Sequence, residues 1–241
     1  MDLPFLWNTF VVLLGGLPLT LELAAISILA GCLLALAIAF LGSFAGPLGS
    51  GFASAYVFVF RGSPLLVQIF LIYYGLGQFR PTLQQIGLWP FLRDPFWCAA
   101  LALTLNTAAY GSEIFRGGLR AVPAREVEAA RACGMSGFLL LRRIIVPIAL
   151  RQALPAYGNE IILMVKATAL ASIITLMEVT GLAQKLISET FRAVEVFVVA
   201  GAIYLALNFI LTRIVLAVEH RLSPHLRDSR VREIDVRSAH A

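Results

Sequence analysis

Two ionisable residues interrupt the apolar stretch at 144–177, and ionisable groups inside such stretches are costly and usually functional. Glu160 and Lys166 lie six residues apart, about 9 Å along a helix axis, which is too far for the usual i, i+4 ion pair. Asn159, Leu163 and Lys166 follow one stripe of the same helix. A ligand that carries a cation and a carboxylate fits this spacing, with Glu160 taking the cation and Lys166 the carboxylate.

Both ionisable residues also have a structural interpretation. A partner on another helix would neutralise either charge, and a lysine side chain can extend towards the membrane surface. Glu113 and Arg116 illustrate the structural case, because their i, i+3 spacing on one helix predicts an ion pair. Both interpretations therefore stay open for Glu160 and Lys166.

The backbone before Glu160 is a second indication of a pathway. Pro155 and Gly158 weaken a helix, and irregular backbone at membrane depth is tolerated where it lines a cavity or is buried in protein. Two other apolar stretches offer polar residues for the same pathway: Gln68, Tyr73, Asn106 and Thr107. Each of these residues alone is more often an interhelical hydrogen bond than a ligand contact.

No catalytic or nucleotide-binding constellation is visible. There is no G-x-x-x-x-G-K-[ST] segment, so the chain has no loop of its own to cradle ATP phosphates. The three cysteines show neither paired nor metal-type spacing and are interpreted as small hydrophobic residues. The three histidines form no zinc spacing and no Ser-His-Asp set. We therefore expect no catalytic residue, no metal and no cofactor in this chain.

The composition is that of a membrane protein. The 241 residues are 59% hydrophobic and 14% charged, with a mean hydropathy of +0.85, whereas soluble domains have about 25% charged residues. A helical span needs about 20 mostly apolar residues, so the chain has room for several. The net charge of +5 does not call for a nucleic-acid partner, because basic residues gather in the cytoplasmic loops of membrane proteins.

Apolar stretches predict five spans, at 17–44, 64–76, 96–114, 144–177 and 194–218. A Gly/Ser/Pro-rich stretch at 42–51 and a short leading helix at 52–60 come between the first two. A loop at 78–95 precedes the third span. The N-terminus lacks a basic segment, so the first span is expected to be retained. A basic tail at 223–241 is expected to be partly disordered.

Arginines gather in two places, the loop at 116–143 and the tail after residue 220. Five spans put both on one side of the membrane, and the positive-inside rule makes that side cytoplasmic and places the N-terminus outside. Arg61, just before the predicted second span, falls on the cytoplasmic side as well. The sequence thus predicts a multi-pass membrane protein.

The loop between the third and fourth spans contains a partly charged, helix-forming segment, 128–147. On a helical wheel, Arg125, Glu128 and Arg131 lie opposite a face of small residues. The small residues are Ala129, Ala130, Cys133, Gly134 and Gly137. A small-residue face lets another surface approach closely, so the segment predicts a short docking helix just outside the membrane.

This segment resembles the EAA motif in the membrane subunits of bacterial ABC importers. It reads Glu128-Ala129-Ala130, three residues, Gly134, nine residues, then Ile144-x-Val146-Pro147. The motif usually ends Ile-x-Leu-Pro, so Val146 is a mild departure. The segments at 60–64 (FRGSP), 105–110 (LNTAAY) and 154–160 (LPAYGNE) resemble the branch for polar and basic amino acids and opines.

The resemblance implies an all-α integral membrane protein with the five-helix type I importer (MetI-like) fold. It implies a place in the bacterial inner membrane, with the N-terminus in the periplasm and the C-terminus in the cytoplasm. It implies a cytoplasmic coupling helix at about 124–137 that docks on a dimer of ATPase subunits, which bind Mg-ATP. The coupling residues would be Glu128, Ala129, Ala130, Arg131, Gly134 and Pro147. A second homologous permease subunit, expected to be a different chain, and a periplasmic substrate-binding protein would complete the complex within the membrane lipid.

The sequence therefore predicts one permease domain, 1–222, that imports a polar and basic amino acid or opine by alternating access. The candidate substrate-binding residues are Gln68, Asn106, Asn159, Glu160, Leu163 and Lys166. An ion-coupled secondary transporter that works without an ATPase is the alternative. The docking helix, the lack of inverted repeats and the few carboxylates available for ion coupling disfavour it.

Overall fold

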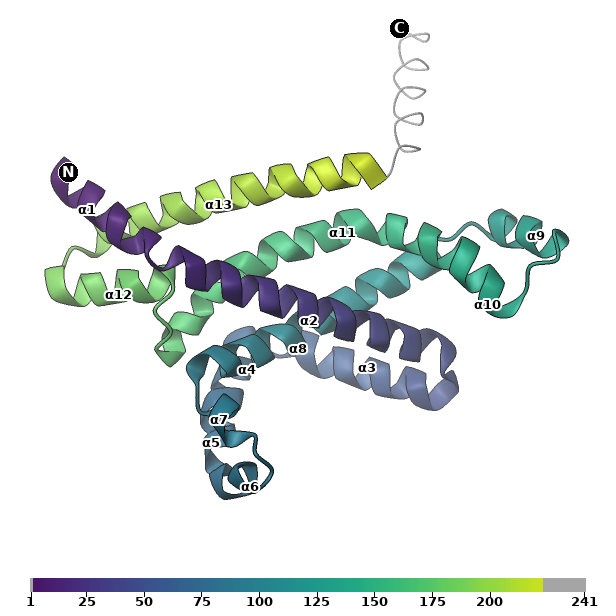
Figure 1. Cartoon of the computed structure of the whole chain (residues 1–241), viewed down its shortest axis with the longest axis horizontal. Coiled ribbons are helices and arrows are strands. Elements are labelled where there is room, and N and C mark those ends of the chain that lie inside the picture. Colours follow the sequence, from purple (N-terminus) through teal and green to yellow (C-terminus); the bar gives the residue numbers. More distant parts are fainter. Residues whose placement is uncertain (1, 223–241) are drawn as a thin grey trace, which may run out of the picture.

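The structure, a computed structural model, describes residues 2–222 and is helical throughout that range, with short connections (Figure 1). The longer helices are α1 (Leu3–Leu14), α2 (Leu17–Phe44), α3 (Gly46–Gly62), α8 (Pro95–Arg120), α9 (Ala124–Ala132), α11 (Val146–Ala167), α12 (Val179–Thr190) and α13 (Ala193–Leu222). The shorter ones are α4 (Leu65–Phe70), α5 (Leu76–Gln78), α6 (Arg80–Gln85), α7 (Trp89–Leu92) and α10 (Gly137–Leu140). The predicted tail at 223–241 lies outside the described residues.

The central element is α8, which packs against α2, α3 and α11. Of its 26 residues 13 are buried, and most of those are small. A Cβ on Gly111 would lie 2.9 Å from the Cβ of Ala35 in α2, and one on Gly118 would meet the backbone of Ala149 in α11. Small residues therefore let α8 approach both neighbours closely, as helices in membranes require.

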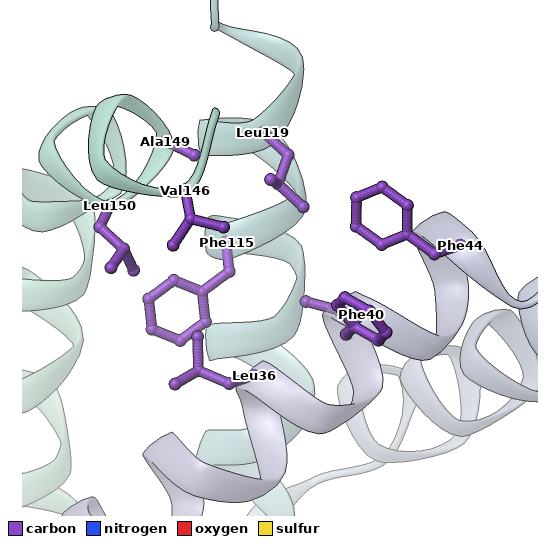
Figure 2. Close-up of a pocket in the computed structure, with 9 residues that line it drawn as sticks. Leu36, Phe40, Phe44, Phe115, Leu119, Val146, Ala149 and Leu150 are labelled. Carbon is purple, nitrogen blue, oxygen red and sulfur yellow. The ribbon is translucent and has the colours of Figure 1, made fainter. Parts of the chain in front are cut away.

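One apolar cavity of about 80 Å³ lies where α2, α8 and α11 meet. Figure 2 shows the Phe115 ring projecting from α8 between Leu36 of α2 and Val146 and Leu150 of α11. Phe115 also stacks on Tyr157, with the ring centroids 5.0 Å apart. This aromatic contact ties the end of α8 to α11 near the loop that follows α8.

The second predicted span, at 64–76, is helical in the structure, but a further helix precedes it. The helix that follows α2 is α3, which contacts α2 and α8 and contains the Gly/Ser/Pro-rich stretch that was expected to be a connection. The chain then bends by 102° between Gly62 and Leu65. Glycines lower hydropathy and helix propensity, yet Gly49 lets α3 start directly against Leu41 and Ala45.

The segments α4 to α7 form a projection at the bottom of Figure 1, and α4 packs against α8 where the projection begins. They include the stretch predicted as a span and the predicted loop at 78–95, which contains α6 and α7. Arg80 lies over the ring of Trp89, 5.4 Å from its centroid. Aromatic residues of this kind suit a membrane–water boundary.

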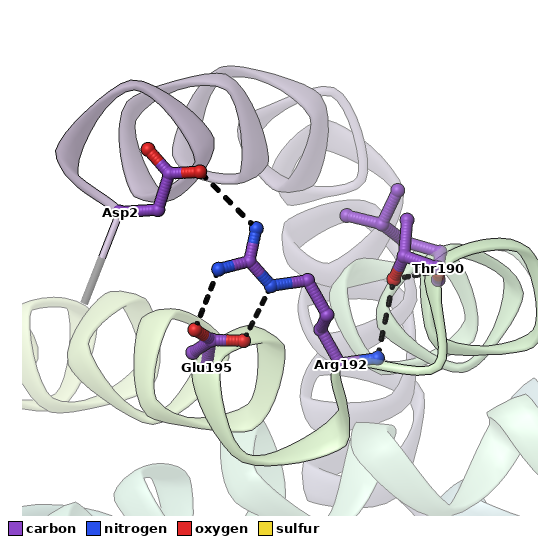
Figure 3. Close-up of polar contacts among 5 residues, drawn as sticks. Asp2, Thr190, Arg192 and Glu195 are labelled. Atoms are coloured by element: carbon purple, nitrogen blue, oxygen red, sulfur yellow. Dashed lines mark hydrogen bonds and ion pairs between the residues drawn. The ribbon is translucent and has the colours of Figure 1, made fainter.

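At the left of Figure 1, α1 and α12 pack against α13 around the buried residues Leu13, Val179 and Val196. A polar contact holds this end together (Figure 3). The Arg192 guanidinium donates two hydrogen bonds of 2.8 Å to the Glu195 carboxylate and one of 3.4 Å to Asp2. The contact joins the start of α1 to the start of α13.

The buried carboxylate of Glu178 caps α12. It accepts hydrogen bonds from the backbone N–H groups of Thr180 and Gly181 and from the hydroxyl of Tyr204 in α13, which lies 2.7 Å away. Gly16, between α1 and α2, has no room for a side chain because the backbone of Glu178 lies against it. The Glu178 side chain therefore joins α12 to α13, and the Glu178 backbone packs against the junction of α1 and α2.

Length and hydropathy alone identify two membrane-crossing stretches in the described part of the chain, Leu3–Phe44 and Ala193–Leu222, and up to four if two bent helix pairs each count as one. The first stretch contains the predicted span 17–44, which matches α2. The central helix α8 is not among the four, since Asn106, Thr107 and Glu113 lower its hydropathy. Its polar groups face protein rather than lipid, because the other helices surround it.

Candidate functional site

A cavity of about 220 Å³ opens between α8 and α11. Its walls are Asn106 and Tyr110 from α8 and Glu160, Leu163, Met164 and Ala167 from α11. The spacing explains the arrangement, because residues four apart on α8, and three, four and seven apart on α11, share a helix face. The structure thus brings together three of the six predicted substrate-binding residues: Asn106, Glu160 and Leu163.

Glu160 is the charged group of the cavity. The residue is 8% exposed, and its carboxylate has no hydrogen bond or ion pair within residues 2–222. A buried carboxylate without a partner is costly in a membrane protein. Its environment therefore favours a cation that enters the cavity.

Arg61 is the nearby positive charge. Its guanidinium carbon lies 5.0 Å from the centroid of the Tyr110 ring, and its charge acts on the Glu160 carboxylate. The Tyr110 ring that Arg61 contacts is six residues, about 9 Å of helix, before Arg116, and the expected cytoplasmic position of Arg61 stays a prediction. Arg61 thus lies at the far end of α3, against the middle of α8.

Gln68 belongs to a hydrogen-bond network beside the cavity. Its amide donates to the carbonyls of Phe60 and Ser63, at 2.8 and 3.1 Å, and its Oε1 accepts a 3.1 Å bond from the Asn106 amide. These bonds satisfy the backbone exposed by the bend between α3 and α4. Gln68 therefore positions Asn106 and does not line the cavity.

Asn159 and Lys166 are exposed and do not line the cavity. On a helix, Lys166 lies about 120° round from Glu160, since six residues turn the chain by about 600°. The stripe predicted to face the pathway was Asn159, Leu163 and Lys166, whereas the face that does so carries Glu160, Leu163, Met164 and Ala167. The role of Asn159 and Lys166 in binding stays a prediction.

The expected break before Glu160 is also wrong, because α11 continues through Pro155 and Gly158. Gly158 instead allows close packing, and a Cβ there would meet Val215 of α13. The irregular backbone lies at both ends of α11. A π-helical segment, Leu141–Ile145, precedes it and a 3₁₀ segment, Thr168–Ile174, follows it.

The residues missed by sequence reasoning are Tyr110, Met164, Ala167 and Arg61. A helical wheel centred on Glu160 would have found Met164 and Ala167, which follow it by four and seven residues. A wheel centred on Asn106 would have found Tyr110, four residues later. Arg61 carried no such signal. Its place depends on how α3 lies across α8.

The predicted docking helix ends earlier than expected. Helix α9 covers Ala124–Ala132, and the chain then turns at Gly134 and Gly137, whose φ angles are +80° and +50°. Residues other than glycine rarely adopt such angles. The small residues therefore do not form one helix face: Ala130 is buried within the loop, and Ala129 is exposed.

The charged residues around this loop lie as the sequence predicts. The side chain of Arg125 is 85% exposed, and the predicted ion pair between Glu113 and Arg116 forms. Pro147 directly follows the π-helical segment Leu141–Ile145, inside the continuous helix that begins at Gly137. An exposed, charged helix with an accessible alanine stands clear of the other helices at the right of Figure 1.

Comparison with known proteins gives consistent matches. Residues 27–224 match the family described as binding-protein-dependent transport system inner membrane component. The chain is 57% identical over 232 residues to the octopine transport system permease protein OccM of Rhizobium meliloti, covering 96% of this chain and 94% of that protein. It is 53% identical to the nopaline transport system permease protein NocM of Agrobacterium fabrum, covering 94% of each.

Further matches extend to arginine permeases and to solved structures. The arginine ABC transporter permease protein ArtM of Haemophilus influenzae is 40% identical over 88% of this chain and 92% of its own length. A crystal structure of an amino acid ABC transporter with histidines matches with a TM-score of 0.80 at 33% identity, over 92% of this chain and 99% of that one. The MetNI methionine ABC transporter, at 18% identity over the same shares of both chains and a TM-score of 0.69, shares the fold.

Proposed function

The chain belongs to the family of binding-protein-dependent transport system inner membrane components, and we propose that this ABC permease subunit imports an opine or a basic amino acid. Its fold is that of the MetI-like type I importers. ATP hydrolysis belongs to a separate ATPase subunit of the importer. The ion-coupled secondary transporter receives no support from any relative.

The cavity beside Glu160 carries the substrate proposal. Glu160 offers an unpaired carboxylate to a substrate cation, and Arg61 offers a positive charge to a substrate carboxylate, with Asn106 and Leu163 completing the wall. Opines and basic amino acids combine these two kinds of charge. The names of the octopine, nopaline and arginine permeases support the same class.

The rest of the complex is proposed on the same basis. The five spans are α2, α3, α8, α11 and α13, with α1 leading into α2, in one permease domain that ends near residue 222. Two clusters of arginine then favour a cytoplasmic loop at 116–143 and a periplasmic N-terminus. Helix α9 couples to an ATPase dimer that holds Mg-ATP, and a second, different permease chain and a periplasmic binding protein complete the importer.

The test is uptake by the whole complex in proteoliposomes. The binding protein, both permeases and the ATPase are reconstituted, and a radiolabelled panel of octopine, nopaline, arginine, histidine and glutamate is offered with ATP inside. We expect ATP-dependent accumulation of cationic substrates or opines and none of glutamate. Accumulation driven by a proton or sodium gradient without ATP would refute the proposal.

A further inference from the structure

We propose that a groove between α2, α11 and α13 binds one anionic phospholipid of the membrane, with its acyl chain along the apolar wall and its phosphate between Arg151 and Arg221. The groove has a volume of about 590 Å³. The proposal requires that the helices lie in a lipid bilayer. It does not depend on which solute the permease carries.

The wall of the groove is apolar and comes from three helices. Leu36 of α2, Phe115 of α8 and Leu150 and Leu154 of α11 line it. Leu36, Phe115 and Leu150 also line the smaller apolar cavity of Figure 2, so the two spaces share a wall. Such a surface offers no partners to water, which needs two to four polar groups, and it suits an acyl chain.

The inner end of the groove is closed by Cys32 and Tyr157. Tyr157 follows Arg151 by six residues, about 9 Å along α11, so the groove extends away from the arginines into the membrane. The Tyr157 hydroxyl donates a hydrogen bond to the Ile28 carbonyl, and its ring rests on Phe115. The polar tip of Tyr157 is thus satisfied without a ligand in the groove.

Two cations lie at the other end. Arg151 of α11 and Arg221 of α13 are exposed and line the groove, and neither forms an ion pair with an acidic side chain among residues 2–222. Glu219, two residues before Arg221, lies instead against Gly158. Arginine binds phosphate through parallel hydrogen bonds, and basic pockets between membrane helices bind acidic lipid headgroups.

This groove is separate from the substrate cavity. Arg151 precedes Glu160 by nine residues, which places the two side chains on opposite sides of α11. An occupant that neutralises two arginines must be anionic, whereas the cavity beside Glu160 favours a cation. The cargo of the permease therefore does not fit the groove.

Native mass spectrometry of the permease–ATPase complex in detergent tests the proposal. The complex is titrated with phosphatidylglycerol, with phosphatidylcholine of the same chains, and with glycerol phosphate, which has the charge without the chains. The test variant is Arg151→Gln/Arg221→Gln. The matched control, Arg143→Gln/Arg213→Gln, removes two exposed arginines from neighbouring segments that do not line the groove.

We expect one phosphatidylglycerol per chain and weaker binding by about fivefold for each groove arginine removed, and no loss in the control. The Leu154→Trp variant narrows the apolar part of the groove and keeps both arginines. It should weaken the binding of phosphatidylglycerol and leave the complex assembled. The proposal would be overturned if the control variant lost phosphatidylglycerol binding to the same extent, or if phosphatidylcholine bound as tightly as phosphatidylglycerol. It would also be overturned if glycerol phosphate bound and neither lipid did. An empty groove in the wild-type complex, covered by the second permease, would overturn it as well.

Discussion

The Glu160→Gln variant distinguishes two roles that Glu160 could have, a contact with the substrate and a charge that stabilises the fold. The residue is 8% exposed and has no hydrogen bond or ion pair within residues 2–222, although the positive charge of Arg61 lies near it. A charge at that depth costs about 2.5 kcal/mol on insertion scales. The neutral amide removes that cost and keeps the shape, so we expect assembly and thermal stability to be unchanged or improved.

The uptake of a cationic substrate should fall in the Glu160→Gln variant, although its stability does not. A hydrogen bond to a charged group contributes about 1.5–3 kcal/mol, which corresponds to about 10- to 150-fold in the uptake of a cationic substrate at low concentration. Basal ATP hydrolysis should not change, because Glu160 lies in the α8–α11 cavity and not in the α9 loop. The assays are radiolabelled uptake, ATP hydrolysis and thermal unfolding of the same preparation.

Glu113→Gln is the matched comparison, because the same chemical change there removes the partner of the half-buried Arg116. We expect it to lower the unfolding temperature without changing the ratio of cationic to neutral substrates. The reasoning is refuted if the Glu160→Gln complex takes up the cationic substrate at the wild-type rate. It is refuted too if that variant loses stability as Glu113→Gln does.

Three other predictions follow from the fold. Ala129→Asp puts a charge on an exposed position of α9, so pull-down should show less ATPase bound while the permease folds normally. With the other native cysteines replaced, Cys133 and a cysteine at Gln84 should react with an impermeant thiol reagent from opposite sides of membrane vesicles. Glu178→Ala removes the cap of α12 and its bond to α13, and thermal unfolding should show a loss of about 1–3 kcal/mol.

A specific result would contradict each of these three predictions. Normal ATPase binding by the Ala129→Asp permease would exclude α9 as the docking helix. Labelling of both cysteine positions from one side would contradict the proposed topology, which has an odd number of spans. An unchanged unfolding temperature for Glu178→Ala would mean that water satisfies the freed backbone groups and the Tyr204 hydroxyl.

The predicted spans show where hydropathy succeeds and where it fails. The first span was predicted with the bounds of α2, because a long apolar run has no other stable place than a membrane-spanning helix. The second was predicted to begin at the bend after α3, because Gly46 and Gly49 make the start of α3 look like a connection. In the structure Gly49 is where α3 meets α2, a contact that hydropathy does not report.

The candidate site was found in part for a similar reason. A buried carboxylate such as Glu160 is conspicuous in any apolar stretch, so its residue type identifies it. Its neighbours depend on the rotation of α11 about its axis, which Ala149 and Ala153 set by packing against Gly118. That rotation selects Met164 and Ala167 for the cavity and leaves Lys166 outside.

The sequence by itself determined the membrane class, the Glu113–Arg116 ion pair and the ABC-importer family. The first two follow from local composition and from spacing along one helix, and the family follows from the resemblance to the EAA motif. Only the tertiary structure decided that Arg61 lies beside Tyr110 and Glu160 and that Gln68 supports Asn106. The physical reason is that an apolar side chain leaves water as readily for lipid as for the protein interior. Hydropathy therefore does not show which helix faces meet, and only the packing between helices decides it.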